Sequence, residues 1–134
     1  TKYGISARSY PHLDIPNIQP IDAQHIYLVD FWQKMGCEQM PDYLAEFVFD
    51  YGVNSGAHKV AREVQRAVGV LPDGVVGPLT KAAIADTEPR KLLRLLFVAR
   101  ARTFAEAPKD TYLEFREGWF ARLFDKTEKA LQSL

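Results

Sequence analysis

Proline and glycine residues divide this chain into short segments, and within most segments the apolar residues recur with the period of an α-helix. The clearest stripe lies between two glycines and consists of Ala57, Val60, Ala61, Val64 and Val68. This spacing places all five side chains on one helical face. Because most segments follow the same period and almost none is typical of a strand, the chain is predicted to be mainly α.

About six helices are expected, over residues 22–35, 41–54, 57–68, 79–85, 89–107 and 110–133. The first is apolar around nearly its whole circumference, which predicts a position in the centre of the fold. Asp110 is the expected cap of the last helix, whose stripe is mostly aromatic: Tyr112, Phe115, Trp119, Phe120, Leu123, Phe124 and Leu131. Residues 1–20 hold three prolines and a glycine and are predicted to form a short extended or hairpin piece followed by a loop.

Composition excludes several classes of protein. The 134 residues include 17 basic and 17 acidic side chains, so no basic field indicates a nucleic acid or an anionic membrane as partner. Cys37 is the one cysteine, which excludes a disulfide framework, and it is interpreted as inert packing. His12, His25 and His58 lack ligand spacing, so neither a metal nor another cofactor is expected. No apolar run is long enough to cross a membrane, and no membrane insertion is expected.

Residues 1–6 and 50–56 are the first two segments that could carry chemistry. In the first, Gly4 would let the backbone approach another group closely, although a plain surface hairpin end is the alternative. In the second, two glycines interrupt a helical pattern at a cost of roughly 1 kcal/mol each. This segment is either a joint between helices capped by Asn54 or a substrate-facing turn. Asp50 lies one turn from Asn54 on the same face and is expected mainly to bond backbone there.

Residues 65–80 form the third segment. Gln65 precedes an Asp73-Gly74 turn, a Gly77-Pro78 step and Thr80, which together predict a compact, ordered loop before a short helix. A basic run follows in the next helix and is interpreted as a solvated face: Arg90, Lys91, Arg94, Arg100 and Arg102.

Taken in order, these segments resemble the glycoside hydrolase family 108 lysozymes with an attached peptidoglycan-binding region, which are phage endolysins and prophage-derived proteins, some labelled secretion activators. The resemblance covers nearly the whole chain and rests on six pieces: the Thr-x-Tyr-Gly-Ile-Ser opening, Tyr27 with Trp32, Asp50 with Asn54-x-Gly56, Gln65, the run from Asp73 to Thr80, and Gly118-Trp119 with Arg122. It implies a lysozyme-like helical fold. It also implies a hydrolase part over residues 1–68 and a peptidoglycan-binding region over residues 69–134, packed as one unit.

The resemblance implies a muramidase that hydrolyses the β-1,4 bond between N-acetylmuramic acid and N-acetylglucosamine. Its expected general acid is a Glu in a Glu-Gly-Gly motif shortly before the position of Thr1, and no such motif occurs in these 134 residues. Either an N-terminal segment is therefore missing here, or the chain is a truncated and inactive form. The alternatives are a non-catalytic peptidoglycan-binding or secretion-regulating protein, and an enzyme that uses Glu46 or Asp50 as its acid.

The resemblance also implies roles for individual residues. The Thr1 hydroxyl would position the attacking water, and Thr1, Tyr3 and Asn54 would surround one groove. The glycan would be bound by Tyr3, Gly4, Ser6, Tyr27, Trp32, Asp50, Asn54 and Gln65, although plain core is the alternative for Tyr27 and Trp32. The peptidoglycan-binding run would consist of Asp73, Gly74, Gly77 and Thr80. Peptidoglycan is the expected partner of this bacterial or phage-encoded protein, which would be made in the cytoplasm and act at the cell wall or in the periplasm.

Overall fold

The computed structural model describes all 134 residues and consists of helices joined by short loops. The α-helices are α1 (Pro20–Tyr27), α2 (Asp42–Ser55), α3 (Ala57–Val68), α4 (Pro78–Ala85), α5 (Pro89–Ala105) and α6 (Lys109–Gln132). Three shorter helical segments are η1 (Ile15–Asn17), η2 (Leu28–Gln33) and η3 (Cys37–Gln39). The only β-pairing is one isolated bridge between Lys2 and Ile5. The prediction of a mainly α chain with six helices is confirmed.

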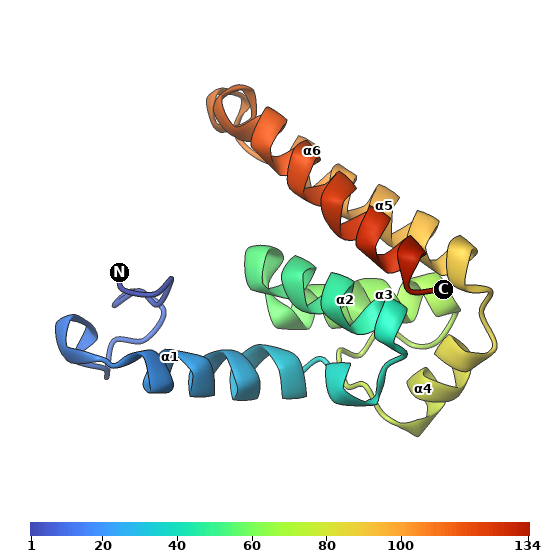
Figure 1. Cartoon of the computed structure of the whole chain (residues 1–134), viewed down its shortest axis with the longest axis horizontal. Helices are drawn as coiled ribbons and strands as arrows, with labels where there is room; N and C mark the ends of the chain where they lie inside the picture. The colour runs from blue at the N-terminus through green and yellow to red at the C-terminus, as the bar shows by residue number, and fades with distance from the viewer.

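The helices lie in three layers (Figure 1). α1 and its continuation η2 form one outer layer, α2 and α3 form the middle, and the hairpin of α5 and α6 forms the other outer layer. The main core lies around α2, which contacts η2, α3, α5 and α6. The predicted α2 stripe is fully buried and consists of Leu44, Phe47, Val48 and Tyr51.

Two glycines shape the middle layer of α2 and α3. Gly56 joins α2 to α3. The joint requires a φ of +101° at this position, and a positive φ of this size favours glycine. Gly52, one turn earlier, faces the buried Met35, and a Cβ there would collide with the Met35 sulfur. The two glycines of residues 50–56 therefore serve a helix joint and a close helix contact.

The predicted central position of the first helix is wrong. Within α1 and η2 only Ala23 is buried, whereas Ile21, Leu28 and Val29 are exposed. The helix packs on α2 through one side only, where Phe31 and Trp32 are half-buried against the core. Apolar residues around a whole helix do not show which faces other elements cover, and here the central helix is α2.

Two expectations for the last helix also need correction. α6 begins after Pro108, so Asp110 lies in its first turn and is not its cap. Of the predicted stripe only Leu123 is fully buried, and Phe115, Phe120 and Phe124 are exposed. In Figure 1 the end of the hairpin at which α5 and α6 join extends past α2 and α3, so the first turns of α6 have α5 as their neighbour and no third layer. Phe124 follows the buried Leu123 and lies on another face of the helix. None of the helices is both long and apolar enough to span a membrane.

Candidate functional site

The N-terminal piece is held against α1 by a hydrogen bond from Tyr27. The bridge between Lys2 and Ile5 closes a tight turn in which Tyr3 and Gly4 have φ of 53° and 80°. The Tyr27 hydroxyl donates to the backbone carbonyl of Tyr3 at 2.8 Å. A Cβ on Gly4 would collide with that hydroxyl, so the glycine permits the close approach that the sequence predicted.

A cavity of about 640 Å³, called here the N-terminal cavity, lies between this piece, η2 and the joint of α2 with α3. Gly4, Ser6 and Tyr27 line it, and Asp30 supplies its only carboxylate. The Tyr10 hydroxyl donates to Asp30 Oδ2 at 2.7 Å. Burial and this hydrogen bond raise the pKa of Tyr10 to about 12, so Tyr10 remains a donor to Asp30 at neutral pH.

A second cavity, of about 410 Å³, adjoins the first and is called the aromatic cavity. Its walls are Tyr27, Trp32, Phe49 and Val53, and its polar lining comes from Gln24, Asp50 and Arg122, with Leu28 at its edge. Tyr27 and Val53 line both cavities, so the N-terminal cavity and the aromatic cavity lie on either side of these two residues. Together they give a concave surface with aromatic faces and hydrogen-bonding groups at its borders.

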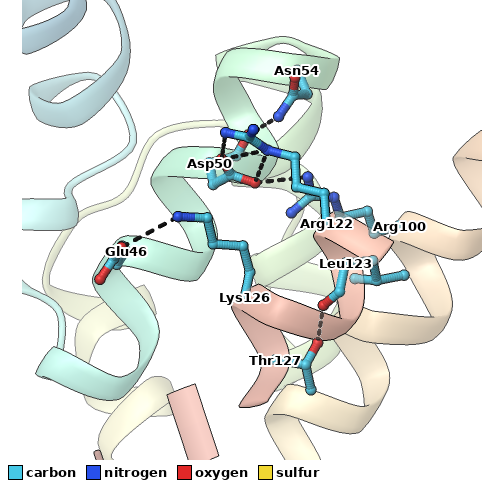
Figure 2. Close-up of polar contacts among 8 residues, drawn as sticks. All are labelled: Glu46, Asp50, Asn54, Arg100, Arg122, Leu123, Lys126 and Thr127. Carbon is cyan, nitrogen blue, oxygen red and sulfur yellow. Dashed lines mark hydrogen bonds and ion pairs between the residues drawn. The ribbon is translucent and has the colours of Figure 1, made fainter. Parts of the chain in front are cut away.

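Asp50 binds two arginines at the border of the aromatic cavity (Figure 2). Its carboxylate accepts hydrogen bonds from Arg100 Nη2 at 2.7 Å, from Arg122 Nε at 3.0 Å and from Arg122 Nη2. Burial alone would raise the pKa of Asp50, but the hydrogen bonds and charges of the two arginines outweigh it and hold that pKa below its usual value. Asp50 is therefore ionised at neutral pH.

This arrangement corrects the expectation that Asp50 mainly bonds backbone. It is the Asp50 backbone carbonyl that takes part in the local bonding, since it accepts from Asn54 Nδ2 at 2.8 Å. The proposal of Asp50 as an in-chain general acid also fails, because a general acid must hold its proton near neutral pH.

Arg100 corrects the interpretation of the basic run as a solvated face. Its side chain is 2% exposed and lies over the rings of Phe47 and Tyr51, with its guanidinium carbon 5.9 and 5.6 Å from their centroids. The other members of the run are exposed: Arg90, Lys91, Arg94 and Arg102. A signal for this difference exists in the sequence, because Arg100 follows Leu93 and Leu96 on the buried stripe of α5.

Gln65 is the centre of a second polar cluster, away from these cavities. Its side chain is 1% exposed, and its Nε2 donates to Asp73 Oδ1 at 3.0 Å, to the Val75 carbonyl at 3.0 Å and to Thr80 Oγ1 at 3.2 Å. Its Oε1 accepts from the Gly74 N–H at 2.8 Å. A backbone hydrogen bond from Val75 and the one from Gln65 lower the pKa of Asp73. The cluster thus orders the loop of residues 69–77 before α4.

Two protein-family models match consecutive parts of the chain. Residues 1–56 match the family model of glycosyl hydrolase 108, and residues 60–124 match the model of a predicted peptidoglycan domain. These two matched segments are called here the glycosyl hydrolase 108 region and the peptidoglycan-binding region.

The structure of Brucella abortus SagA has the same fold as this chain. The two sequences are 23% identical, the TM-score is 0.84, and the alignment covers 96% of this chain and 78% of that chain. Comparison with curated proteins gave no match. The family resemblance inferred from the sequence is confirmed, and the two regions indicate a function connected with bacterial peptidoglycan.

The glycosyl hydrolase 108 region contains most of the predicted glycan-binding residues. Gly4, Ser6 and Tyr27 share the N-terminal cavity, and Tyr27, Trp32 and Asp50 share the aromatic cavity. Thr1 and Tyr3 are exposed and line neither of them. Asn54 lines a third cavity beyond Arg122. The structure therefore does not bring Thr1, Tyr3 and Asn54 together around any of these three cavities.

The peptidoglycan-binding region contains the other predicted residues. Gln65, Asp73, Gly74 and Thr80 do meet, but their polar groups pair with one another, and Gly77 precedes α4. A role for them in glycan binding stays a prediction. Cys37 is buried, and burial raises its thiol pKa to about 12, which fits inert packing. No group of three or more His, Cys, Asp or Glu side chains is placed to hold a metal ion.

Proposed function

We propose that these 134 residues form the glycan-binding part of a lysozyme-type muramidase that cleaves the β-1,4 bond between N-acetylmuramic acid and N-acetylglucosamine. The observation that supports this most is the pair of adjoining cavities in the glycosyl hydrolase 108 region, with the aromatic walls of Tyr27 and Trp32. Aromatic rings offer a flat apolar face to a sugar, and Gln24 and Arg122 offer donors beside it.

The proton donor is proposed to come from a Glu-Gly-Gly motif outside these 134 residues. Glycoside hydrolysis needs a carboxylic acid that is protonated before it meets the leaving oxygen. Asp50 is ionised, and Glu46 is exposed, pairs with Lys126 at 3.4 Å and lines neither the N-terminal nor the aromatic cavity. Neither residue suits the role. The 69–134 part, with the loop ordered by Gln65, is proposed to add contacts to the wall.

The water would be activated on the side of the N-terminal cavity. The water-positioning role of Thr1, which is exposed and lines neither cavity, stays a prediction. Asp30 adds a carboxylate that the sequence-based prediction missed, although a lone acid inside the apolar run from Ile26 to Trp32 was the signal for it. In an inverting enzyme such a base would lie about 6.5–9.5 Å from the acid. If Asp30 is the base, Asp30→Asn in a protein that carries the Glu-Gly-Gly motif abolishes hydrolysis and leaves wall binding unchanged.

Binding and cleavage can be tested separately. We expect the 134-residue chain to sediment with purified peptidoglycan sacculi and to release no reducing ends from them. A longer product of the same gene that carries the motif is expected to release reducing ends, and a Glu→Gln change in the motif is expected to abolish this release. Absence of both binding and cleavage on susceptible walls would contradict the proposal.

The second candidate is a non-catalytic peptidoglycan-binding or secretion-regulating protein. The observation that favours it is that neither Asp50 nor Glu46, the two in-chain acids considered, suits the role of the acid. A longer gene product that binds sacculi without releasing reducing ends would establish it. For either candidate we propose synthesis in the cytoplasm of a bacterium, from a bacterial or phage gene, and action at the cell wall or in the periplasm.

A further inference from the structure

The cluster around Asp50 holds more positive than negative charge. One carboxylate lies between two guanidinium groups, and no other acid forms an ion pair with Arg100 or Arg122. Nε and Nη1 of Arg100 are buried without a hydrogen-bond partner. Buried donors are seldom left unpaired in proteins. The cluster is therefore suited to a second anion beside Asp50.

A third cavity, called here the arginine cavity, lies where such an anion would be placed. It has a volume of about 240 Å³ and is lined by both arginines, at the end of α2 and between α5 and α6. Asn54, Ser55 and Thr103 add polar groups, and Phe104 and Trp119 add apolar ones. This volume is below the roughly 300–1,000 Å³ of pockets for drug-sized ligands. The cavity thus suits a group smaller than a drug-sized ligand, such as a carboxylate carried by a short aliphatic chain.

Arg122 connects this cavity to the proposed glycan site. Its side chain is 56% exposed and lines both the aromatic cavity and the arginine cavity. A sugar ring against Tyr27 and Trp32 would direct a substituent past the Arg122 guanidinium. Muramic acid carries such a substituent, because its lactyl group bears the peptide stem and the stem bears carboxylates.

We propose that the arginine cavity binds a carboxylate of peptidoglycan, with Arg122 as its first contact and Arg100 behind it. The planar fork of arginine matches a carboxylate in two parallel hydrogen bonds. The inference rests on the proposed function and adds to it the part of the substrate that this side of the site recognises.

The test compares Arg122→Gln with Lys126→Gln in the 134-residue chain. Both variants remove one positive charge from α6, and Lys126 lies one turn further along, paired only with the exposed Glu46 at 3.4 Å. Arg122→Gln is expected to weaken binding to purified sacculi about tenfold, or about 1.4 kcal/mol, and Lys126→Gln less than about twofold. The fold is checked by thermal unfolding, since Arg100 still pairs with Asp50 in the Arg122 variant.

A second variant, Ala107→Leu, fills the arginine cavity without changing either arginine. It is expected to weaken binding to a similar extent. Because Arg122 also lines the aromatic cavity, this variant separates the two cavities: if Ala107→Leu binds sacculi as tightly as the unchanged chain, the inference is overturned.

Two modified substrates identify the source of the carboxylate. In sacculi whose carboxylates have been converted to amides with carbodiimide and ammonia, the unchanged chain and Arg122→Gln are expected to bind alike. Glycan strands stripped of peptide by an amidase lose the stem carboxylates and gain a free lactyl carboxylate, which is an amide in intact sacculi. A difference between the two proteins that disappears on these strands assigns the stem, and one that persists shows that the arginine cavity also accepts a carboxylate at the lactyl position.

Failure of the inference is distinguishable from failure of the proposed function. If the unchanged chain binds native sacculi and Arg122→Gln binds them as Lys126→Gln does, the inference is overturned and the proposed function stands. If the unchanged chain binds no form of peptidoglycan, the proposed function fails and the inference fails with it.

Discussion

Two buried polar clusters connect the helices of this chain, and they differ in how completely their hydrogen bonds are paired. Gln65 uses both its amide nitrogen and its amide oxygen within the loop of residues 69–77 and Thr80. The Asp50 cluster leaves donors of Arg100 unpaired and a positive charge in excess, next to two cavities. A saturated cluster leaves few of its polar groups for a ligand, whereas an unsaturated one beside a cavity is suited to bind one.

Removal of Asp50 is expected to have the largest effect on stability. Asp50→Ala leaves Arg100 buried without its only ion-pair partner, and breaking one partner of a buried pair typically costs about 3–5 kcal/mol. The free energy of unfolding in urea at neutral pH measures this. The matched control is Glu46→Ala, one turn earlier on α2 and paired only with Lys126, which should change it by less than about 0.5 kcal/mol. A loss below about 1 kcal/mol for Asp50→Ala would show that the pair is not a structural element.

Removal of Gln65 is expected to have a smaller effect, because no charge is left unpaired. Gln65→Ala frees the Gly74 N–H and the hydroxyl of buried Thr80, and unsatisfied neutral groups cost about 1–3 kcal/mol. Unfolding in urea measures this loss of stability, and Gln132→Ala, at the exposed end of α6, is the control. If Gln65→Ala is as costly as Asp50→Ala, the distinction between the neutral and the charged cluster is wrong.

Two glycine substitutions test whether the loop needs its exact backbone shape. Gly74 has φ +82°, and a Cβ there would collide with the His58 ring, so Gly74→Ala should cost about 1–2 kcal/mol. Gly118 lies in α6 with open space around it, and Gly118→Ala should stabilise by up to about 1 kcal/mol. The melting temperatures of both variants measure these effects. Equal changes in melting temperature, of the same sign, would refute the assignment of strain to Gly74.

Acidification is expected to weaken both clusters. The folded-state pKa values of Asp50 and Asp73 lie below those of the unfolded chain, so their stabilisation is complete above about pH 4 and is lost as the pH falls through the folded values. Asp73→Asn should therefore have a lower free energy of unfolding than the unchanged chain at pH 7. Urea titrations at a series of pH values should show this difference becoming smaller towards pH 3. A difference in free energy of unfolding that does not change with pH would show that the Asp73 charge does not contribute to stability.

The helices could be predicted from sequence because their signals are local. Glycines at 56 and 69 delimit α3, and Pro41, Pro89 and Pro108 stand where α2, α5 and α6 begin. The covered faces could not be predicted in the same way. The first helix carries apolar residues on all sides, and only the arrangement of α2 and α3 decides which of them are buried.

The candidate site was predicted in part for the same reason. Tyr27 and Trp32 were identified from their residue types and do line the aromatic cavity. The partners of Asp50 lie 50 and 72 residues further along the chain, so no local pattern could reveal that it binds Arg100 and Arg122. Gln65 was selected as a glycan-binding residue, which stays a prediction, and its buried position showed only in the structure.

The two tryptophans give the most direct test of the account. Trp32 lines the aromatic cavity and Trp119 the arginine cavity, and the chain has no other indole. In an NMR titration of the ¹⁵N-labelled chain with soluble disaccharide-peptide fragments of peptidoglycan, we expect both indole N–H signals and the Arg122 Nε–H signal to shift. The backbone amides of Gly74 and Val75 are expected to stay unchanged. Shifts confined to the loop of residues 69–77, with both indole signals unmoved, would contradict the account.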